Sequence, residues 1–239
     1  MPASQALIVC SQKGGVGKTT TSLGLAVSLH RQGHSVVLVD ADSLNCIENC
    51  VNVTPDPENP ELGRWKRYTM QPLPSLKVLV NNSRSPLETY ELKLLLNSLD
   101  GGIAIIDSPP MIDPQITHML KAATAVLVVA SIEPWSLRTM PLVLEALLEN
   151  RSAGHSFEFL GVLATCLHGD DTEKEWVPKL RTQFGGAFLP TVLPFEPTQA
   201  KAIMDGVPLA LSKPDCPLVK AFDQVASQIA QRLLTPAGA

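Results

Sequence analysis

The sequence predicts an α/β protein with a largely parallel sheet. Short apolar runs alternate along the chain with longer segments whose apolar residues recur at helical spacing, which is the pattern of strand–helix–strand units. Hydrophobic residues make up 45% of the 239 residues and charged residues only 18%, so the chain can bury a substantial core. We expect residues 1–239 to form a single large domain.

Strands are expected where a short apolar run is bounded by turn residues. In chain order, these runs are residues 6–10, 36–39, 77–81, 103–106, 125–130, 159–165 and 191–193. The second and fourth runs close on Asp40 and Asp107. The stretch 51–76 contains five prolines and breaks this rhythm, so it predicts an insertion or a long loop within the domain.

Helices are expected where apolar residues recur at spacings of three and four. The first covers about residues 19–32 and ends at Gly33, a residue type that often follows a helix. Ser-Pro-Leu-Glu at residues 85–88 places a cap, a proline and a glutamate at a helix start, and that helix should run to about residue 99. Further helices are expected over residues 136–150 and 215–233.

Charge, hydropathy and cysteine content exclude several classes of protein. The net charge of −4 excludes a strongly basic nucleic-acid-binding chain, although a local basic patch remains possible. The longest nearly apolar run, residues 122–132, is too short to span a bilayer, and residues 1–5 lack the cations of a secretory signal. Five cysteines form no CxxC pair. We therefore expect a soluble cytoplasmic protein.

A glycine-rich motif lies between the first expected strand and the first expected helix, the context that a phosphate-binding loop requires. Glycines let successive backbone N–H groups face inward, and these groups form an anion cradle with the helix N-terminus. Lys18 would reach the β- and γ-phosphates, and the Thr19 hydroxyl would bind Mg²⁺. Gln12 stands where the common pattern GxxxxGK[ST] has glycine, but the variant KGGxGK[ST] matches completely. The expected nucleotide-binding residues in the loop are Lys13, Gly14, Gly15, Val16, Gly17, Lys18, Thr19 and Thr20.

This loop and three later segments resemble the ParA/MinD family of deviant Walker A ATPases. The later segments are residues 37–42, which end in Asp-Ala-Asp, residues 105–110, which contain Asp-Ser-Pro-Pro, and residues 161–165. The resemblance covers essentially the whole chain except the proline-rich stretch. It implies a doubly wound, mostly parallel sheet with helices on both faces, ATP and Mg²⁺ as ligands, and slow, partner-stimulated ATP hydrolysis. Ser43-Leu44 stand where the family usually has Pro-Gln.

Three aspartates at strand ends are candidate site residues. Asp107 lies where open α/β sheets bind ligands, and its carboxylate could hold Mg²⁺ through a water. A turn aspartate ahead of two prolines is the alternative. Asp40 and Asp42 are two residues apart and point the same way in an extended segment. The resemblance implies that Asp42 orients the attacking water and that Asp40 supports the metal shell, whereas simple turn capping by Asp42 is the alternative.

The resemblance gives Lys13 a role in a dimer. It implies that this lysine reaches the phosphates of a second copy in an ATP-bound homodimer, where positive charge would stabilise the transferring phosphoryl group. Hydrolysis would then release the two copies. A solvated loop lysine is the alternative. The segments 165–168 and 193–197 should flank the base, with no single side chain assigned.

The cargo is less clearly indicated. The resemblance implies partition of plasmid or chromosomal DNA, or of another large cargo, with an activating partner that is ParB-like or analogous, in the bacterial cytoplasm or on the nucleoid. A MinD-like or protein-assembly positioner is the alternative. Two further alternatives are an iron–sulfur carrier that uses Cys46 and Cys50, and a small-molecule kinase or ligase. The closing helix carries only Lys220 and Arg232 as cations, so no membrane tail is expected.

Two cationic clusters could contact nucleic acid. The first comprises Lys174, Lys179, Arg181, Lys201 and Lys213. Nearby glutamates reduce the net positive charge of this cluster, so a solvated helix face is an equal alternative. The second is the Arg-Trp-Lys-Arg-Tyr sequence at residues 64–68, which could bind nucleic acid or a protein, or could be a partly buried loop anchored by Trp65.

Overall fold

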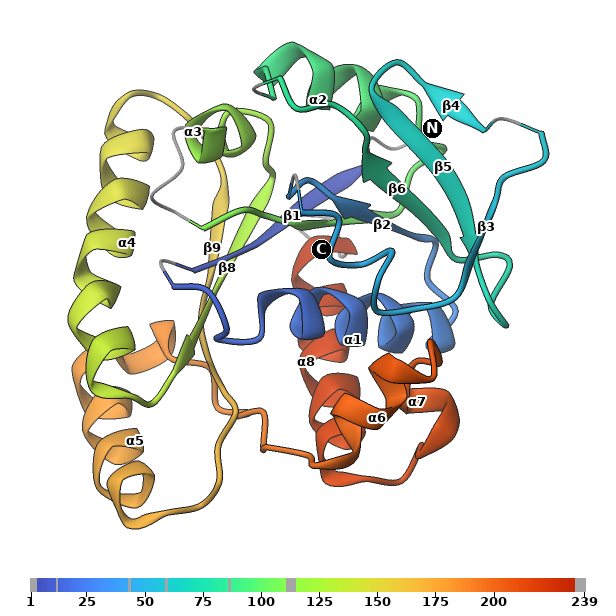
Figure 1. Cartoon of the computed structure of the whole chain (residues 1–239). Helices are drawn as coiled ribbons and strands as arrows, with labels where there is room; N and C mark the ends of the chain where they lie inside the picture. Colours follow the sequence, from blue (N-terminus) through green and yellow to red (C-terminus); the bar gives the residue numbers. More distant parts are fainter. Residues whose placement is uncertain are drawn as a thin grey trace.

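The computed structural model describes residues 4–11, 13–42, 44–58, 60–85, 87–110 and 115–234, without the side chains of Gln115 and Trp135. Within these residues one nine-stranded sheet has the order β3-β5-β6-β2-β7-β1-β8-β9, and β4 pairs with β5 (Figure 1). Its parallel strands are β1 (Gln5–Cys10), β2 (Val36–Asp40), β6 (Lys77–Asn81), β7 (Ile103–Asp107), β8 (Ala125–Ser131) and β9 (Glu158–Thr165). An antiparallel extension comprises β3 (Val53–Pro55), β4 (Glu61–Leu62) and β5 (Trp65–Met70).

Helices cover both faces of the sheet. One face packs against α1 (Lys18–Arg31), α6 (Thr198–Met204), α7 (Leu209–Ser212) and α8 (Pro217–Leu234). The other packs against α2 (Thr89–Asn97), α3 (Gln115–Leu120), α4 (Pro134–Ser152) and α5 (Asp171–Phe184), which the short 3₁₀ turn η1 (Gly185–Ala187) follows. The doubly wound α/β fold that the sequence predicts is therefore confirmed.

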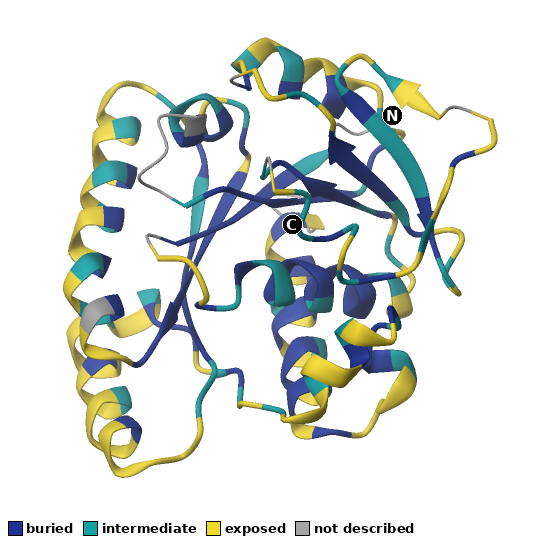
Figure 2. Cartoon of the chain, viewed as in Figure 1, coloured by how far each residue is buried: buried dark blue, intermediate teal, exposed yellow. Residues whose placement is uncertain are grey.

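The strands are apolar on both faces because both faces are covered. Leu7 of β1 belongs to the core layer beneath α1 and α8, whereas its neighbour Ile8 belongs to the layer beneath α2 to α5. Figure 2 shows the central strands as almost continuously buried between exposed outer helix faces. The uninterrupted apolar runs in the sequence thus follow from burial on two sides. None of the described helices has the length and apolar character needed to cross a membrane.

Three expectations about individual elements are wrong, and two of them concern strands. The long loop expected over residues 51–76 instead supplies β3, β4 and β5, which extend the sheet beyond β6. Residues 191–193 form no regular strand, because Pro190 and Pro194 flank them and lack N–H donors, although Leu193 bonds to the backbone at the end of β9. Whether the segment 51–76 is an insertion stays a prediction.

The second helix also begins later than expected. It starts at Thr89 and ends at Asn97, with Glu88 as its cap. Glu88 and Glu91 form a reciprocal capping box, in which the Glu88 N–H donates to the Glu91 carboxylate at 2.9 Å. Ser85, the expected cap, instead hydrogen-bonds the Ser83 hydroxyl at 2.7 Å. Pro86, which was part of that expected start, lies outside the described residues.

Candidate functional site

The glycine-rich loop connects the end of β1 to the first residue of α1, as the sequence predicts. Gly15 and Gly17 have φ angles of +80° and +87°, a region that residues with a side chain rarely adopt. Gly17 precedes α1, and no side chain caps the helix there, so its first N–H groups are free to bind an anion. Lys18 is buried, and its ammonium group donates to the Lys13 carbonyl at 3.4 Å. Gln12, which departs from the common loop pattern, lies outside the described residues.

Two buried carboxylates lie beside the start of α1. Asp40 ends β2 and Asp107 ends β7, and they are direct register partners on adjacent parallel strands. Asp107 accepts hydrogen bonds from the Thr19 hydroxyl at 2.7 Å and from the Ser22 hydroxyl at 3.0 Å. Asp40 is 0% exposed, and one of its oxygens accepts the Ile47 N–H at 2.8 Å. Its other oxygen, Oδ1, is buried without a partner among the described residues.

Burial makes both carboxylates hard to ionise. The pKa of Asp40 is raised to about 7, mainly because burial removes solvent and also because of the neighbouring Asp107 charge, while the Ile47 hydrogen bond opposes the shift. Loss of solvent also raises the pKa of Asp107 to about 6, although the Thr19 and Ser22 hydroxyls oppose this shift. Two acids whose ionisation is this costly form a site that a cation would stabilise.

The donor set fits Mg²⁺ better than a transition metal. The unpartnered Asp40 oxygen, the Asp107 carboxylate and the Thr19 hydroxyl are all hard oxygen ligands. Within the described part of the chain, no three His, Cys, Asp or Glu side chains form a ready-made metal cluster. This suits Mg²⁺, which commonly takes one or two protein carboxylates and completes its shell with water and phosphate oxygens.

Asp42 lies at the edge of this site. Its Oδ1 atom accepts the Leu44 N–H at 3.0 Å, so one oxygen does close a turn, as the alternative interpretation proposed. The other oxygen has no hydrogen bond within the described residues. Leu44 is 74% exposed beside it, and Ser43 lies outside the described residues. The water-orienting role of Asp42 stays a prediction.

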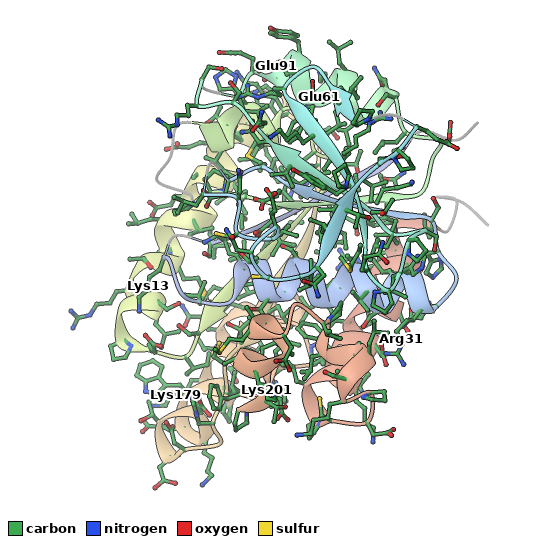
Figure 3. All side chains as sticks on the ribbon, turned by 45° about the vertical axis from the view of Figure 1, so that its right-hand side comes forward. Lys13, Arg31, Glu61, Glu91, Lys179 and Lys201 are labelled. Carbon is green, nitrogen blue, oxygen red and sulfur yellow. The ribbon has the colours of Figure 1, made fainter. Side chains whose placement is uncertain are left out.

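Lys13 lies at the surface of the loop and has a partner within its own chain. Its ammonium group forms an ion pair with the Glu133 carboxylate at 2.8 Å, and the two side chains are 43% and 55% exposed. Figure 3 labels Lys13 at the edge of the molecule beside α4, whose N-cap is Glu133. No sequence pattern indicates this contact, because the two residues are 120 positions apart.

A pocket of about 260 Å³ adjoins the glycine-rich loop. Its wall includes Thr165 and Cys166 at the end of β9 and residues 193–197, so both segments expected to flank the base contribute. Thr165 also donates its hydroxyl proton to the Val16 carbonyl at 2.7 Å, which fixes the loop against β9. His168, also expected there, stacks on Phe195 with ring centroids 4.3 Å apart.

Sequence reasoning missed the part of the pocket wall that the helices α6 and α8 supply. Gln199, Ala200 and Ile203 belong to α6, and Leu218 and Phe222 belong to α8. No local motif marks these residues, because they reach the pocket only when both helices fold back on α1.

In both predicted cationic clusters, cations are engaged with groups of their own chain. In the first, each lysine is paired with an acid: Lys174 with Asp171, Lys179 with Glu175, Lys201 with Asp205, and Lys213 with Glu196. Arg181 donates to the Pro190 carbonyl at 2.7 Å. In the second, Arg64 pairs with Glu91, and Trp65 is only 2% exposed. Trp65 is therefore not available for base stacking, and it is buried in a strand rather than in a loop.

The cysteines considered for an iron–sulfur cluster do not share a helix face. Cys46 and Cys50 lie in a turn segment after β2 and are half-buried free thiols. Burial raises the pKa of Cys50 to about 11, which disfavours the thiolate that a cluster needs.

Comparisons with known proteins agree with this geometry. The sequence model of the CobQ/CobB/MinD/ParA nucleotide binding domain matches residues 7–209. The chain is 28% identical to the chromosome-partitioning ATPase Soj of Thermus thermophilus, over 95% of this chain and 96% of that protein.

Two solved structures are similar in fold. The cell division protein MinD of Aquifex aeolicus has a TM-score of 0.76 and 21% identity, over 95% of this chain and 96% of that one. The septum site-determining protein MinD of Pyrococcus horikoshii, complexed with Mg-ADP, has a TM-score of 0.76 and 19% identity, over 99% of this chain and 100% of that one.

Proposed function

The chain belongs to the CobQ/CobB/MinD/ParA family of nucleotide-binding domains, and on this premise we propose that it is a magnesium-dependent ATPase that dimerises around ATP. The observation that carries the proposal is the pair of buried carboxylates, Asp40 and Asp107, beside a glycine-rich loop at an uncapped helix N-terminus. Such a site offers N–H groups and a lysine to phosphates and oxygen ligands to a cation.

Each residue of the site has a role in binding ATP. The N–H groups of the loop and the Lys18 ammonium would hold the phosphates, and the pocket lined by Thr165, Cys166 and residues 193–197 would hold the base. Thr19, Asp107 and Asp40 would hold Mg²⁺. Held by these residues, Mg²⁺ would supply positive charge against the negative charge that develops on the phosphates.

Hydrolysis converts ATP and water to ADP and phosphate. The Asp42 oxygen that has no hydrogen bond to the described residues would accept one from the attacking water and orient it. Lys13 would supply positive charge to the transferring phosphoryl group of a second copy, as an arginine finger does in trans. Without a γ-phosphate to bridge, the two copies would separate, which makes the dimer a nucleotide-dependent switch.

We propose partition of DNA or another large cargo, with an activating partner, as the role of this cycle. The similarity of the chain to the chromosome-partitioning ATPase Soj of Thermus thermophilus supports this role. Positioning of a protein assembly is the second candidate, and the ion pairs of Lys174, Lys179 and Lys201 favour it, because paired cations bind phosphates weakly. Retention of the ATP-bound protein on DNA at moderate salt would support DNA as the cargo, and its absence would support a protein assembly.

The test of the ATPase proposal is Lys18→Ala. Loss of a charge-assisted hydrogen bond to phosphate should weaken ATP binding by about 10- to 150-fold and abolish phosphate release. Lys220→Ala is the matched control, since Lys220 is an exposed lysine on α8. Unchanged ATP affinity in Lys18→Ala would contradict the loop assignment. A phosphorylated small molecule in place of free phosphate would point to a kinase or ligase.

A further inference from the structure

Three contacts within the chain hold residue 13. The Lys13 carbonyl accepts hydrogen bonds from the Ser11 hydroxyl at 2.9 Å and from the Lys18 ammonium at 3.4 Å. The Lys13 ammonium pairs with Glu133 at 2.8 Å, and we call this contact the cis ion pair. Both lysines that the proposed function assigns to phosphates are therefore engaged with groups of their own chain.

Nucleotide binding would remove the hydrogen bond from Lys18 to the Lys13 carbonyl. When the Lys18 ammonium binds phosphate oxygens, the Lys13 carbonyl keeps the hydrogen bond from the Ser11 hydroxyl. The cis ion pair does not depend on Lys18 and would persist in the ATP-bound protomer. It is then the remaining contact that fixes the Lys13 side chain before a second copy arrives.

The second copy would compete directly with Glu133. The carboxylate and a γ-phosphate are both anions, and one ammonium contacting both at hydrogen-bond distance would bring the two negative charges within a few ångströms of each other. Their repulsion means that engagement of Lys13 in trans breaks the cis ion pair. Each dimer contains two such lysines, so two ion pairs are lost for each dimer formed.

We propose that Glu133 competes with the ATP of the second copy for Lys13, so that the cis ion pair sets the concentration at which ATP-bound protomers dimerise. This inference rests on the proposed function. Glu133 is a positioning residue, since it would act through Lys13. The Glu133 side chain makes no capping hydrogen bond to α4, so replacing it removes no helix cap.

The experiment compares Glu133→Gln with Glu145→Gln. Glu145 is an exposed glutamate on the same helix, has no ion pair within the described residues, and controls for the change in net charge. The monomer–dimer equilibrium is measured by sedimentation with Mg²⁺ and a non-hydrolysable ATP analogue. Glu133→Gln should dimerise about 2- to 30-fold more tightly than Glu145→Gln, because one exposed ion pair changes an equilibrium constant by about 1.4- to 5-fold.

A Lys13→Ala background isolates the pair. There, Glu133→Gln and Glu145→Gln should have equal dimer constants, because the lysine for which Glu133 competes is absent. In the chain that retains Lys13, the difference between the dimer constants of the two glutamine variants should shrink at high salt.

Two results would overturn the inference alone: a wild-type chain that dimerises while both glutamine variants have the same dimer constant, or a weaker dimer in Glu133→Gln. A wild-type chain that binds the analogue yet stays monomeric would overturn the dimerising ATPase itself, and this inference with it.

Discussion

Replacing Asp40 by asparagine should stabilise the protein above neutral pH when nucleotide and Mg²⁺ are absent. Asp40 is 0% exposed, its Oδ1 atom has no partner among the described residues, and its register partner is a second buried carboxyl, Asp107. An asparagine can still accept the Ile47 N–H through its amide oxygen. The substitution therefore removes an ionisable group and keeps the hydrogen bond.

The magnitude follows from the pKa of Asp40, which burial raises from 3.8 to about 7. Between these values the folded chain holds a proton that the unfolded chain has released, so the free energy of unfolding falls as pH rises from about 4 to 7. A pKa about 3 pH units above its ordinary value corresponds to about 4 kcal/mol. Asp40→Asn should equal wild type near pH 4 and gain up to about 4 kcal/mol at pH 8.

The assay is urea denaturation in a chelating buffer at several pH values between 4 and 8. Asp100→Asn, at an exposed position, controls for the change in net charge. Adding Mg²⁺ and ATP should stabilise wild type more than Asp40→Asn, because only the carboxylate gains a cation. Parallel pH profiles of the free energy of unfolding for wild type and Asp40→Asn would refute the claim that burial makes the Asp40 carboxyl costly to ionise.

Three further substitutions test other parts of the structure. Asp42→Ala should keep the ATP-bound dimer but stop turnover; phosphate release at the wild-type rate would remove its role with water. Gly24→Ala should cost about 1–3 kcal/mol in urea denaturation, because the added Cβ would lie 2.5 Å from the Phe222 ring, and Phe222→Leu should relieve that cost. Thr165→Val should cost about 1–3 kcal/mol and weaken ATP binding, since the Val16 carbonyl loses its 2.7 Å donor; equal ATP affinity would contradict this coupling.

The strand ends show how far sequence reasoning reached at the site. Apolar runs closing on Asp40 and Asp107 located both carboxyls at strand ends, which confirms that local patterning positions them. Their adjacency depends on strand order, in which β7 lies between β2 and β1. No local signal encodes that order, because it results from packing between segments that are far apart in the chain.

Short-range periodicity and glycine positions are enough to predict the central strands, the start of α1 and the glycine-rich loop between β1 and α1. The strands within residues 51–76 depend instead on long-range pairing, since β5 needs β6 as its partner. The ion pair of Lys13 with Glu133 and the burial of Asp40 likewise arise from contacts between distant segments. The contacts and the raised pKa values result from burial and from pairing between distant segments. The spacing of residues along the chain specifies neither the contacts nor the pKa values.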